Sequence, residues 1–255
     1  MKVLVVIPAR YASTRLPAKA LADIGGKPMI QRVWERGRAA RGVDDVVVAT
    51  DDERIVRLVE SFGGRAVMTS PAHASGTDRL AEVAAGHAAD VYVNLQGDLP
   101  FAPPTMVEAV LRPFEDPGVR LSTLARAITE AADVYNPNVV KVVMDRHGDA
   151  LYFSRSPIPY IRDRADRGLD TPPPDTYYQH FGLYGYRRQT LREFAGWPKG
   201  RLEDLEKLEQ LRALENGCPI RVEVTAESTQ EVNTPEDLEH ARAEAMGSAT
   251  AGRTV

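Results

Sequence analysis

The 255-residue sequence lacks several features that mark common classes of protein. Its only cysteine, Cys218, excludes an intramolecular disulfide and is typical of a reducing cytoplasm. No apolar run approaches the roughly 20 residues that span a bilayer, and no charged leader with a cleavage site precedes the first apolar run. The net charge of −4 offers no global basic field. We therefore expect a cytoplasmic protein with neither nucleic acid nor membrane as partner.

The standard phosphate-binding motifs are also absent from the first loop. An apolar run, residues 3–7, predicts a buried strand that stops at Pro8, and the loop after it is neither G-x-x-x-x-G-K-[ST] nor G-x-G-x-x-G. That loop carries three cations, Arg10, Arg15 and Lys19. They indicate either a solvated surface loop or a polyphosphate site, in which loop N–H groups and cations share anionic oxygens. The density of cations favours the polyphosphate site. The absence of both motifs points toward nucleotidyl transfer, not toward hydrolysis or hydride transfer.

Apolar runs alternate with helical patterns through the first half of the chain. Strands are expected at 46–49, 65–69 and 91–95, and helices at 29–40, 53–62 and 77–88. This alternation predicts right-handed crossovers and an α/β fold with a doubly wound, mostly parallel sheet. Ligands of such sheets lie beyond the carboxyl ends of the strands. We therefore expect Arg10, Lys19 and Asp98 to converge at one edge.

The second half is less regular. Strands are expected at 121–126, 139–144, 180–187 and 220–225, and a helix at 202–215. Thr234 with Pro235 and Asp237 predicts the start of a C-terminal helix. The small, polar tail 247–255 is expected to be disordered. We expect one domain over residues 1–246, in which about 150–190 form an excursion for dimerisation and acceptor binding.

An acidic residue follows one of the predicted central strands. Asp98 comes shortly after the apolar run 91–93, at the edge where the phosphates are expected. An isolated Asp after a strand is often a turn former. Carboxylates together with phosphate oxygens also hold Mg²⁺ in phosphoryl-transfer sites. We interpret Asp98 as a magnesium ligand.

Six separated blocks of the sequence resemble the CMP-KDO synthetase (3-deoxy-manno-octulosonate cytidylyltransferase) family. The blocks are IPARYASTRLPAK (7–19), SGTDRLAE (75–82), NLQGD (94–98), ALYFSR (150–155), HFGLYGY (180–186) and LEQLR (208–212). The resemblance runs from residue 1 to about residue 244. It implies a Rossmann-like nucleotidyltransferase fold, a homodimer, and Mg²⁺ as cofactor. It also implies that CTP and the sugar acid KDO give CMP-KDO and pyrophosphate, in lipopolysaccharide precursor synthesis.

The resemblance also implies roles for individual residues. The CTP-binding set would be Ala9, Arg10, Arg15, Lys19, Ser75, Gly76 and Arg79, of which the last three lie against cytosine and select it. Arg10, Lys19 and Asp98 would be catalytic. The acceptor pocket would contain Gln96, Arg155, His180, Tyr184, Glu209 and Gln210. Structural alternatives stay open, because Tyr184 fits a core position, Glu209 a solvated helix position, and a single His is more often structural.

The mechanism implied by this resemblance needs no covalent nucleophile. An acceptor oxygen attacks the α-phosphorus in line, and pyrophosphate leaves. Positioning and charge neutralisation by Mg²⁺, Lys19 and the arginines would dominate the lowering of the barrier. Cys218 lies in a predicted turn away from every motif and is assigned no role.

Two positions depart from the family pattern. Leu99 stands where the family has an acidic residue after Asp98, and Asn233 stands where it has the aspartate that completes the metal site. Asn233 offers a neutral carbonyl oxygen and one charge less for a metal. The acceptor blocks favour KDO, but the alternatives are another acid such as the phosphonate phosphonoformate, or a catalytically silent CTP-binding protein. A sugar-phosphate nucleotidyltransferase for another base is a further alternative, which block 75–82 disfavours.

Overall fold

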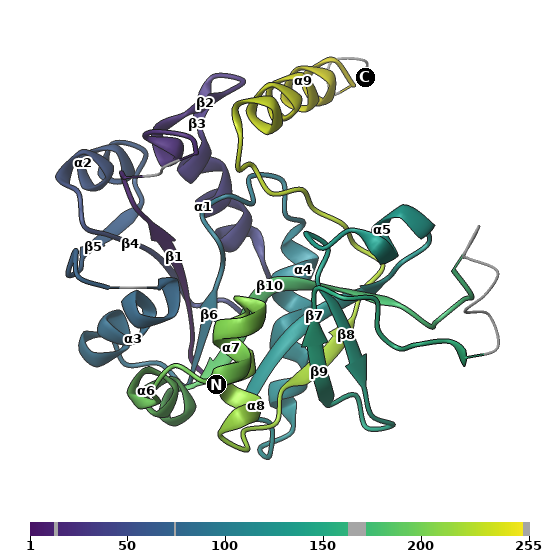
Figure 1. Cartoon of the computed structure of the whole chain (residues 1–255). Helices are drawn as coiled ribbons and strands as arrows, with labels where there is room; N and C mark the ends of the chain where they lie inside the picture. The colour runs from purple at the N-terminus through teal and green to yellow at the C-terminus, as the bar shows by residue number, and fades with distance from the viewer. Residues whose placement is uncertain (13–14, 74, 163–171, 252–255) are drawn as a thin grey trace. The chain divides into compact units, whose positions relative to one another are not determined.

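The computed structural model describes residues 1–12, 15–73, 75–162 and 172–251 (Figure 1). The chain divides into two compact units, Met1–Val107 with Ser228–Val255, and Glu108–Glu227. Within the described ranges, no helix combines the length and the apolar character needed to cross a membrane.

Four parallel strands form the sheet of the first unit. β1 (Val3–Ala9) lies between β6 (Val91–Asn94) and β4 (Asp45–Thr50), and β5 (Arg65–Met68) pairs with β4. Apart from Pro8, the residues of β1 are buried, and α1 and α3 both pack on this strand. The prediction of a mostly parallel, doubly wound sheet is confirmed in this unit.

The structure differs from the expectation at Pro8. β1 continues through Pro8 to Ala9, and Pro8 is in register with Ala49 of β4. A proline lacks the N–H that a central strand donates on one side. It is tolerated here because the pairing of β1 with β6 ends at Val6, so no ladder hydrogen bond is interrupted on that side.

Three helices of the first unit are α1 (Met29–Ala39), α2 (Glu53–Ser61) and α3 (Gly76–Gly86). The two ends of α2 show the local chemistry that bounds a helix. The Asp52 side chain accepts a hydrogen bond from the N–H of Arg54 at the start of α2, and Gly63 adopts a φ of 80° just after its end. These are the roles that an N-cap carboxylate and a left-handed glycine fill.

The C-terminal helix α9 (Pro235–Ala251) packs against the short strand β2 (Asp23–Ile24), which pairs with β3 (Lys27–Pro28). Thr234 and Asp237 form the expected reciprocal cap. The Thr234 N–H donates to Asp237 Oδ2 with a nitrogen-to-oxygen distance of 2.9 Å, and the Asp237 N–H donates to Thr234 Oγ1 at 3.2 Å. The helix extends over 247–251, part of the tail that was expected to be disordered, and 252–255 lie outside the described residues.

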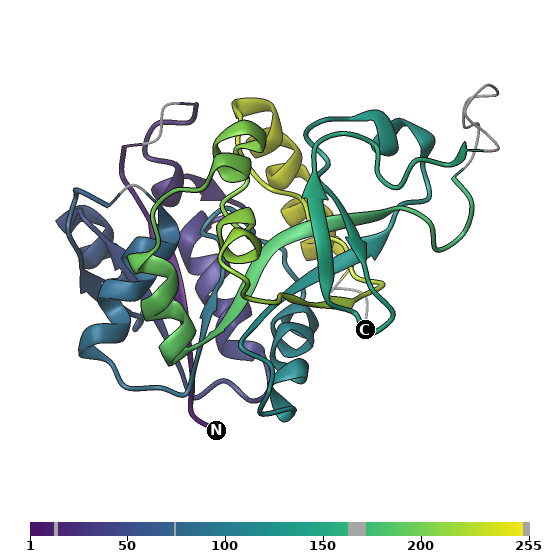
Figure 2. The same ribbon diagram turned by 60° about the horizontal axis from the view of Figure 1, so that its bottom comes forward.

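The second unit contains a mixed sheet. β7 (Leu121–Ala127) pairs antiparallel with β10 (Tyr178–Arg187) and parallel with β11 (Arg221–Val224). The hairpin of β8 (Lys141–Met144) and β9 (Ala150–Ser154), teal in Figure 2, joins β10 through β8. Part of the proposed excursion, residues 163–171, lies outside the described residues.

The shorter helices complete the element order. They are η1 (Lys19–Leu21), α4 (Pro104–Leu111), η2 (Arg112–Glu115), α5 (Ala131–Tyr135), α6 (Arg188–Gly196), α7 (Arg201–Glu206) and α8 (Leu211–Glu215). The prediction of one helix over 202–215 is wrong, because Lys207 adopts a left-handed φ of 55° and separates α7 from α8. An apolar periodicity does not report a single left-handed residue.

Candidate active site

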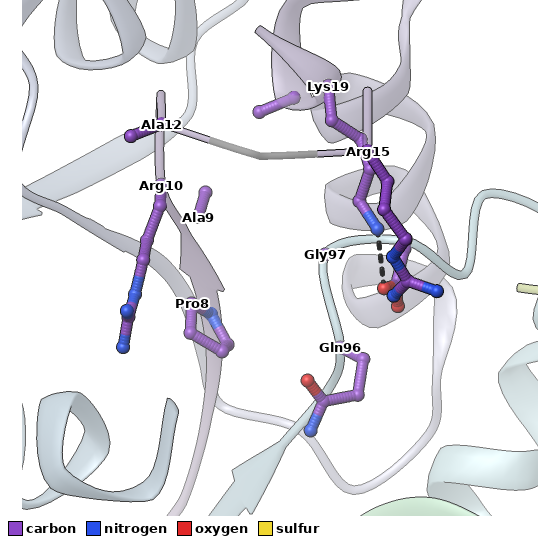
Figure 3. Close-up of a pocket in the computed structure, with 10 residues that line it drawn as sticks. Pro8, Ala9, Arg10, Ala12, Arg15, Lys19, Gln96 and Gly97 are labelled. Carbon is purple, nitrogen blue, oxygen red and sulfur yellow. Dashed lines mark hydrogen bonds and ion pairs between the residues drawn. The ribbon is translucent and has the colours of Figure 1, made fainter. Parts of the chain in front are cut away.

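A cavity of about 400 Å³ opens at the carboxyl end of β1 (Figure 3). Its described lining is Pro8, Ala9, Arg10, Ala12, Arg15, Lys19, Ala20, Gln96, Gly97 and Asp98. These residues come from the end of β1, the segment after it, and the segment after β6, which pairs with β1. The predicted convergence of Arg10, Lys19 and Asp98 at this edge is therefore confirmed.

Glycines allow the segments around the cavity to approach closely. A Cβ atom on Gly97 would lie 2.8 Å from the Pro8 carbonyl oxygen, which is too short for a real contact. A Cβ atom on Gly76 would lie 3.2 Å from Pro8 Cγ. Gly76, predicted to lie against a base, therefore stands beside the strand end that lines the cavity.

Lys19 is the centre of the polar contacts at the cavity. Its ammonium donates to Asp98 Oδ2 at 2.7 Å, the dashed line in Figure 3, and to Asn233 Oδ1 at 3.0 Å. Arg15 donates to the same Asn233 oxygen at 3.1 Å. The Lys19 and Asp98 side chains keep 18% and 21% of their surface exposed, so solvent screens part of their attraction.

Asn233 and its neighbours are held close to Asp98. The N–H of Val232 donates to the Asp98 carbonyl oxygen at 3.0 Å, and the N–H of Asn233 donates to Asp237 Oδ2 at 2.9 Å. The Asn233 amide in turn donates to Glu231 Oε2 at 2.8 Å. Glu231 is a residue of this cluster that the sequence patterns did not single out.

The environment of Glu231 raises the pKa of its carboxyl group. Although the residue keeps exposed surface, the surrounding protein limits hydration of the carboxylate, and the Asp98 charge adds repulsion. The hydrogen bond from Asn233 and the charges of Lys19 and Arg15 act in the opposite direction.

The oxygens of this cluster fit a magnesium ion. Asp98 and Glu231 offer carboxylate oxygens and Asn233 an amide oxygen, which are the hard donors that Mg²⁺ prefers. Among the described residues, no group of three or more His, Cys, Asp and Glu side chains forms a complete metal cage. Mg²⁺ is typically held by one or two protein carboxylates together with substrate phosphates, so this set suffices. Leu99 is buried and adds no donor.

The residues expected to select a base form a helix start and a buried ion pair. Ser75 caps α3 through a reciprocal pair of 3.1 Å hydrogen bonds with Asp78. Arg79 is fully buried, donates to Asp51 Oδ2 at 2.8 Å, and also bonds Thr69 Oγ1. No sequence pattern linked Asp51 to Arg79.

Two of the predicted acceptor residues lie side by side in the second unit. The His180 and Tyr184 rings are 5.5 Å apart, and a His180 ring nitrogen is 3.0 Å from Thr123 Oγ1. Burial lowers the pKa of His180 to about 3, so its imidazole is neutral. Burial also raises the pKa of Tyr184 well above its usual value, so its phenol keeps its proton.

Arg155 is held by backbone carbonyls. Its guanidinium donates to the carbonyl oxygens of Glu206 at 2.8 Å and Pro137 at 2.9 Å. The backbone N–H of Arg155 donates to Glu206 Oε2. The fully buried Lys141 donates to the Arg155 carbonyl oxygen at 2.7 Å, and burial lowers its pKa. Sequence reasoning missed Lys141 and Glu206, since neither belongs to a quoted block.

The break between α7 and α8 places Glu209 and Gln210. Arg212 makes two hydrogen bonds to the Glu203 carboxylate, at 2.7 and 2.8 Å, and lies 3.7 Å from Glu209 Oε1. The Gln210 Nε2 atom is buried and has no hydrogen-bond partner in the described part of the chain. Buried donors are almost always paired, so this N–H group is open to a water molecule or to an oxygen of a bound molecule.

Known proteins resemble this chain over nearly its whole length. A cytidylyltransferase family model matches residues 4–228. The 3-deoxy-manno-octulosonate cytidylyltransferase of Geobacter sulfurreducens is 54% identical over 243 residues, covering 94% of this chain and 97% of the relative. The enzyme of the same name from Syntrophotalea carbinolica is 52% identical over 249 residues, covering 97% of this chain and 100% of the relative.

Solved structures agree with these relatives. A CMP:2-keto-3-deoxy-manno-octonic acid synthetase complexed with CTP aligns with a TM-score of 0.90 and 47% identity, over 97% of this chain and 100% of that one. A 4-diphosphocytidyl-2C-methyl-D-erythritol synthase from Anaerococcus prevotii, covering 96% of this chain and 98% of that one, has a TM-score of 0.63 and 12% identity, which shows a shared fold alone.

Proposed function

This chain belongs to the cytidylyltransferase family, and we propose that it transfers CMP from CTP to 3-deoxy-manno-octulosonate (KDO) with release of pyrophosphate. The cavity that Arg10, Arg15, Lys19 and Asp98 line together carries this proposal, because it combines cations for a triphosphate with a carboxylate for a metal. KDO is proposed as the acceptor because the relatives named 3-deoxy-manno-octulosonate cytidylyltransferase are 54% and 52% identical to this chain over nearly its whole length.

The donor side would work by positioning. Arg10, Arg15 and Lys19, with the backbone at Ala9, would hold the triphosphate, since guanidinium forks and an ammonium share phosphate oxygens. Ser75, Gly76 and Arg79 would select cytosine. Gly76 stands against Pro8 at the cavity, and the buried ion pair of Arg79 would make that wall rigid.

Mg²⁺ is part of this proposal, with Asp98 and Asn233 as its protein ligands. When bound, the ion would neutralise phosphate charge in the transition state. Lys19 holds Asp98 and Asn233 in place before CTP arrives, and would then turn its ammonium to the phosphates. The acceptor hydroxyl would attack the α-phosphorus and pyrophosphate would leave, with no covalent bond to the chain.

We propose Arg155, His180, Tyr184, Glu209 and Gln210 as acceptor-binding residues of the second unit. Gln96, which lines the cavity of the first unit, is proposed for the same role. The unpaired buried amide of Gln210 supports this assignment, since an acceptor hydroxyl or carboxylate would complete it. Neutral His180 and the protonated phenol of Tyr184 would orient the acceptor by hydrogen bonds.

We further propose a single catalytic domain over 1–246, a homodimer and a cytoplasmic enzyme. Tyr160 and Leu151 in the excursion, and Tyr135, are 76%, 63% and 54% exposed, and a dimer interface that included them would bury this apolar surface. The buried lone Cys218 suits a reducing compartment. Light scattering of the purified chain measures the oligomeric state, and a monomer would contradict the dimer.

An acceptor panel tests the proposed reaction. The purified chain receives CTP and Mg²⁺ with KDO, its amino analogue, other ulosonic acids or phosphonoformate, and pyrophosphate and the CMP product are measured. We expect turnover with KDO, and none when UTP replaces CTP. Turnover with the phosphonate alone would contradict KDO as the acceptor. CTP binding in calorimetry without pyrophosphate from any acceptor would indicate a silent binding protein.

A further inference from the structure

We propose that Glu231 supplies the negative charge with which this chain holds a divalent cation beside an asparagine at position 233. In this arrangement Asn233 is the oxygen ligand, and Glu231 is the residue that orients it and balances charge. The inference rests on the proposed function, because it concerns the cation that accompanies CTP. It assigns to Glu231 a role that its position outside every motif does not suggest.

A continuous set of hydrogen bonds links Glu231 to the cavity. The Glu231 carboxylate accepts from the Asn233 amide nitrogen at 2.8 Å, and the amide oxygen accepts from Lys19 at 3.0 Å. Lys19 in turn donates to Asp98 at 2.7 Å. An amide whose nitrogen donates to a carboxylate has its oxygen turned the other way. Glu231 therefore fixes the Asn233 oxygen toward Lys19, the oxygen a cation would use.

Glu231 adds a second carboxylate to the charged groups that surround the Asn233 side chain. Arg15 and Lys19 both donate to the Asn233 oxygen, and Asp98 is their carboxylate neighbour at the cavity edge. Without Glu231 these groups carry a net charge of +1, which repels a divalent cation. With Glu231 the charge is zero. Residues that hydrogen-bond to a metal-coordinating side chain typically change metal affinity by about 10-fold to 100-fold when they are altered.

Glu231 and Asn233 form a matched pair. An aspartate at 233 would place a carboxylate oxygen where the amide nitrogen now donates, 2.8 Å from Glu231. Two carboxylates at that distance repel each other, and one of them gains a proton or moves away. The neutral amide at 233 is therefore compatible with a carboxylate at 231. The negative charge is then on Glu231, behind Asn233, and not on residue 233 itself.

Mn²⁺ binding measures the role of Glu231 without turnover. Electron paramagnetic resonance of free Mn²⁺ gives the affinity of the chain for Mn²⁺ in the presence of CTP. We expect Glu231→Gln to weaken this affinity by about tenfold. Glu231→Asp keeps the charge and should recover most of the affinity. The matched control is Glu236→Gln, which removes an equal charge at an exposed position nearby and should bind Mn²⁺ as the wild type does.

CTP binding without metal distinguishes the loss of the Glu231 charge from a structural defect in the variant. In EDTA, Glu231→Gln should bind CTP as tightly as the wild type or more tightly, because a negative charge near the triphosphate has been removed. A structural defect would weaken metal-free CTP and Mn²⁺ binding together. Equal losses in both measurements, or unchanged Mn²⁺ binding in Glu231→Gln, would overturn the proposal.

A double-mutant cycle tests the pairing. Asn233→Asp restores a ligand charge, so Glu231→Gln should leave Mn²⁺ affinity unchanged or improve it in that background, although it weakens binding beside Asn233. The same loss in both backgrounds would contradict the pairing. Failure of the proposed reaction is a separate result, because it would appear as the absence of CMP-KDO with Mn²⁺ binding intact.

Discussion

The Lys19 ammonium lies 2.7 Å from Asp98 Oδ2 and joins the loop after β1 to the loop after β6. The two residues are 79 positions apart in the chain, and they meet because β1 and β6 are parallel neighbours. The contact keeps an acidic residue in place beside a cluster of cations. A triphosphate would compete with Asp98 for Lys19, and a divalent cation would compete with Lys19 for Asp98.

Replacing Lys19 by methionine should lower kcat/KM for CTP by about 10²- to 10³-fold, the usual effect of removing one donor from a developing charge. Stability should change by about 1 kcal/mol or less, because the pair is partly exposed. Steady-state kinetics and urea unfolding measure the two effects. Lys27→Met is the control, since Lys27 pairs with Glu35 away from the cavity lining and should leave kcat/KM unchanged. Equal kinetic losses in both variants would contradict the role of Lys19.

Replacing Asp51 by asparagine should destabilise the chain by about 2–3 kcal/mol. The Arg79 guanidinium has no exposed surface and would lose its carboxylate partner, while the 17% exposure of Asp51 moderates the full cost of a broken buried pair. Urea unfolding at equilibrium measures the change. Asp45→Asn, at the exposed pair with Arg65, should cost about 1 kcal/mol or less. A loss at Asp51 no larger than at Asp45 would show that the buried pair contributes little.

Replacing Gly97 by alanine should cost about 1–3 kcal/mol and raise KM for CTP, because the new methyl group would sit 2.8 Å from the Pro8 carbonyl oxygen and force the cavity wall to move. Thermal unfolding and kinetics measure both effects. Gly86→Ala is the matched control, since nothing lies within 4 Å of its Cβ position and alanine favours the helix. Wild-type stability in Gly97→Ala would contradict this account of the close approach.

His180 should make the chain less stable as the pH falls. Its pKa is lowered from 6.5 to about 3 in the folded state, so the unfolded chain binds more protons between these values. The free energy of unfolding then falls with decreasing pH, by up to about 1.4 kcal/mol per unit from this residue. Urea unfolding at about pH 7 and about pH 5 should show a smaller loss in His180→Gln than in the wild type. Equal losses would contradict a neutral, buried His180.

Much of the first unit follows from local patterns. Apolar runs predicted β1, β4 and β6, because a strand buried on both faces needs consecutive apolar residues. The helix expected at 53–62 is found as α2, with a capping carboxylate at Asp52 and a left-handed glycine at Gly63. Patterns failed where one backbone angle or one missing partner strand decided the outcome, as at Lys207 and Pro8.

The sequence by itself determined the elements of the first unit, the cationic loop after β1 and the family, since each is written in short stretches of neighbouring residues. Only the tertiary structure decided which side chains meet. Asp51 on Arg79, Glu206 on Arg155 and Glu231 beside Asn233 are contacts that no short motif encodes. Their partners depend on strand order and loop paths, and a hydrogen bond forms only within about 3 Å, a distance that a sequence pattern does not report.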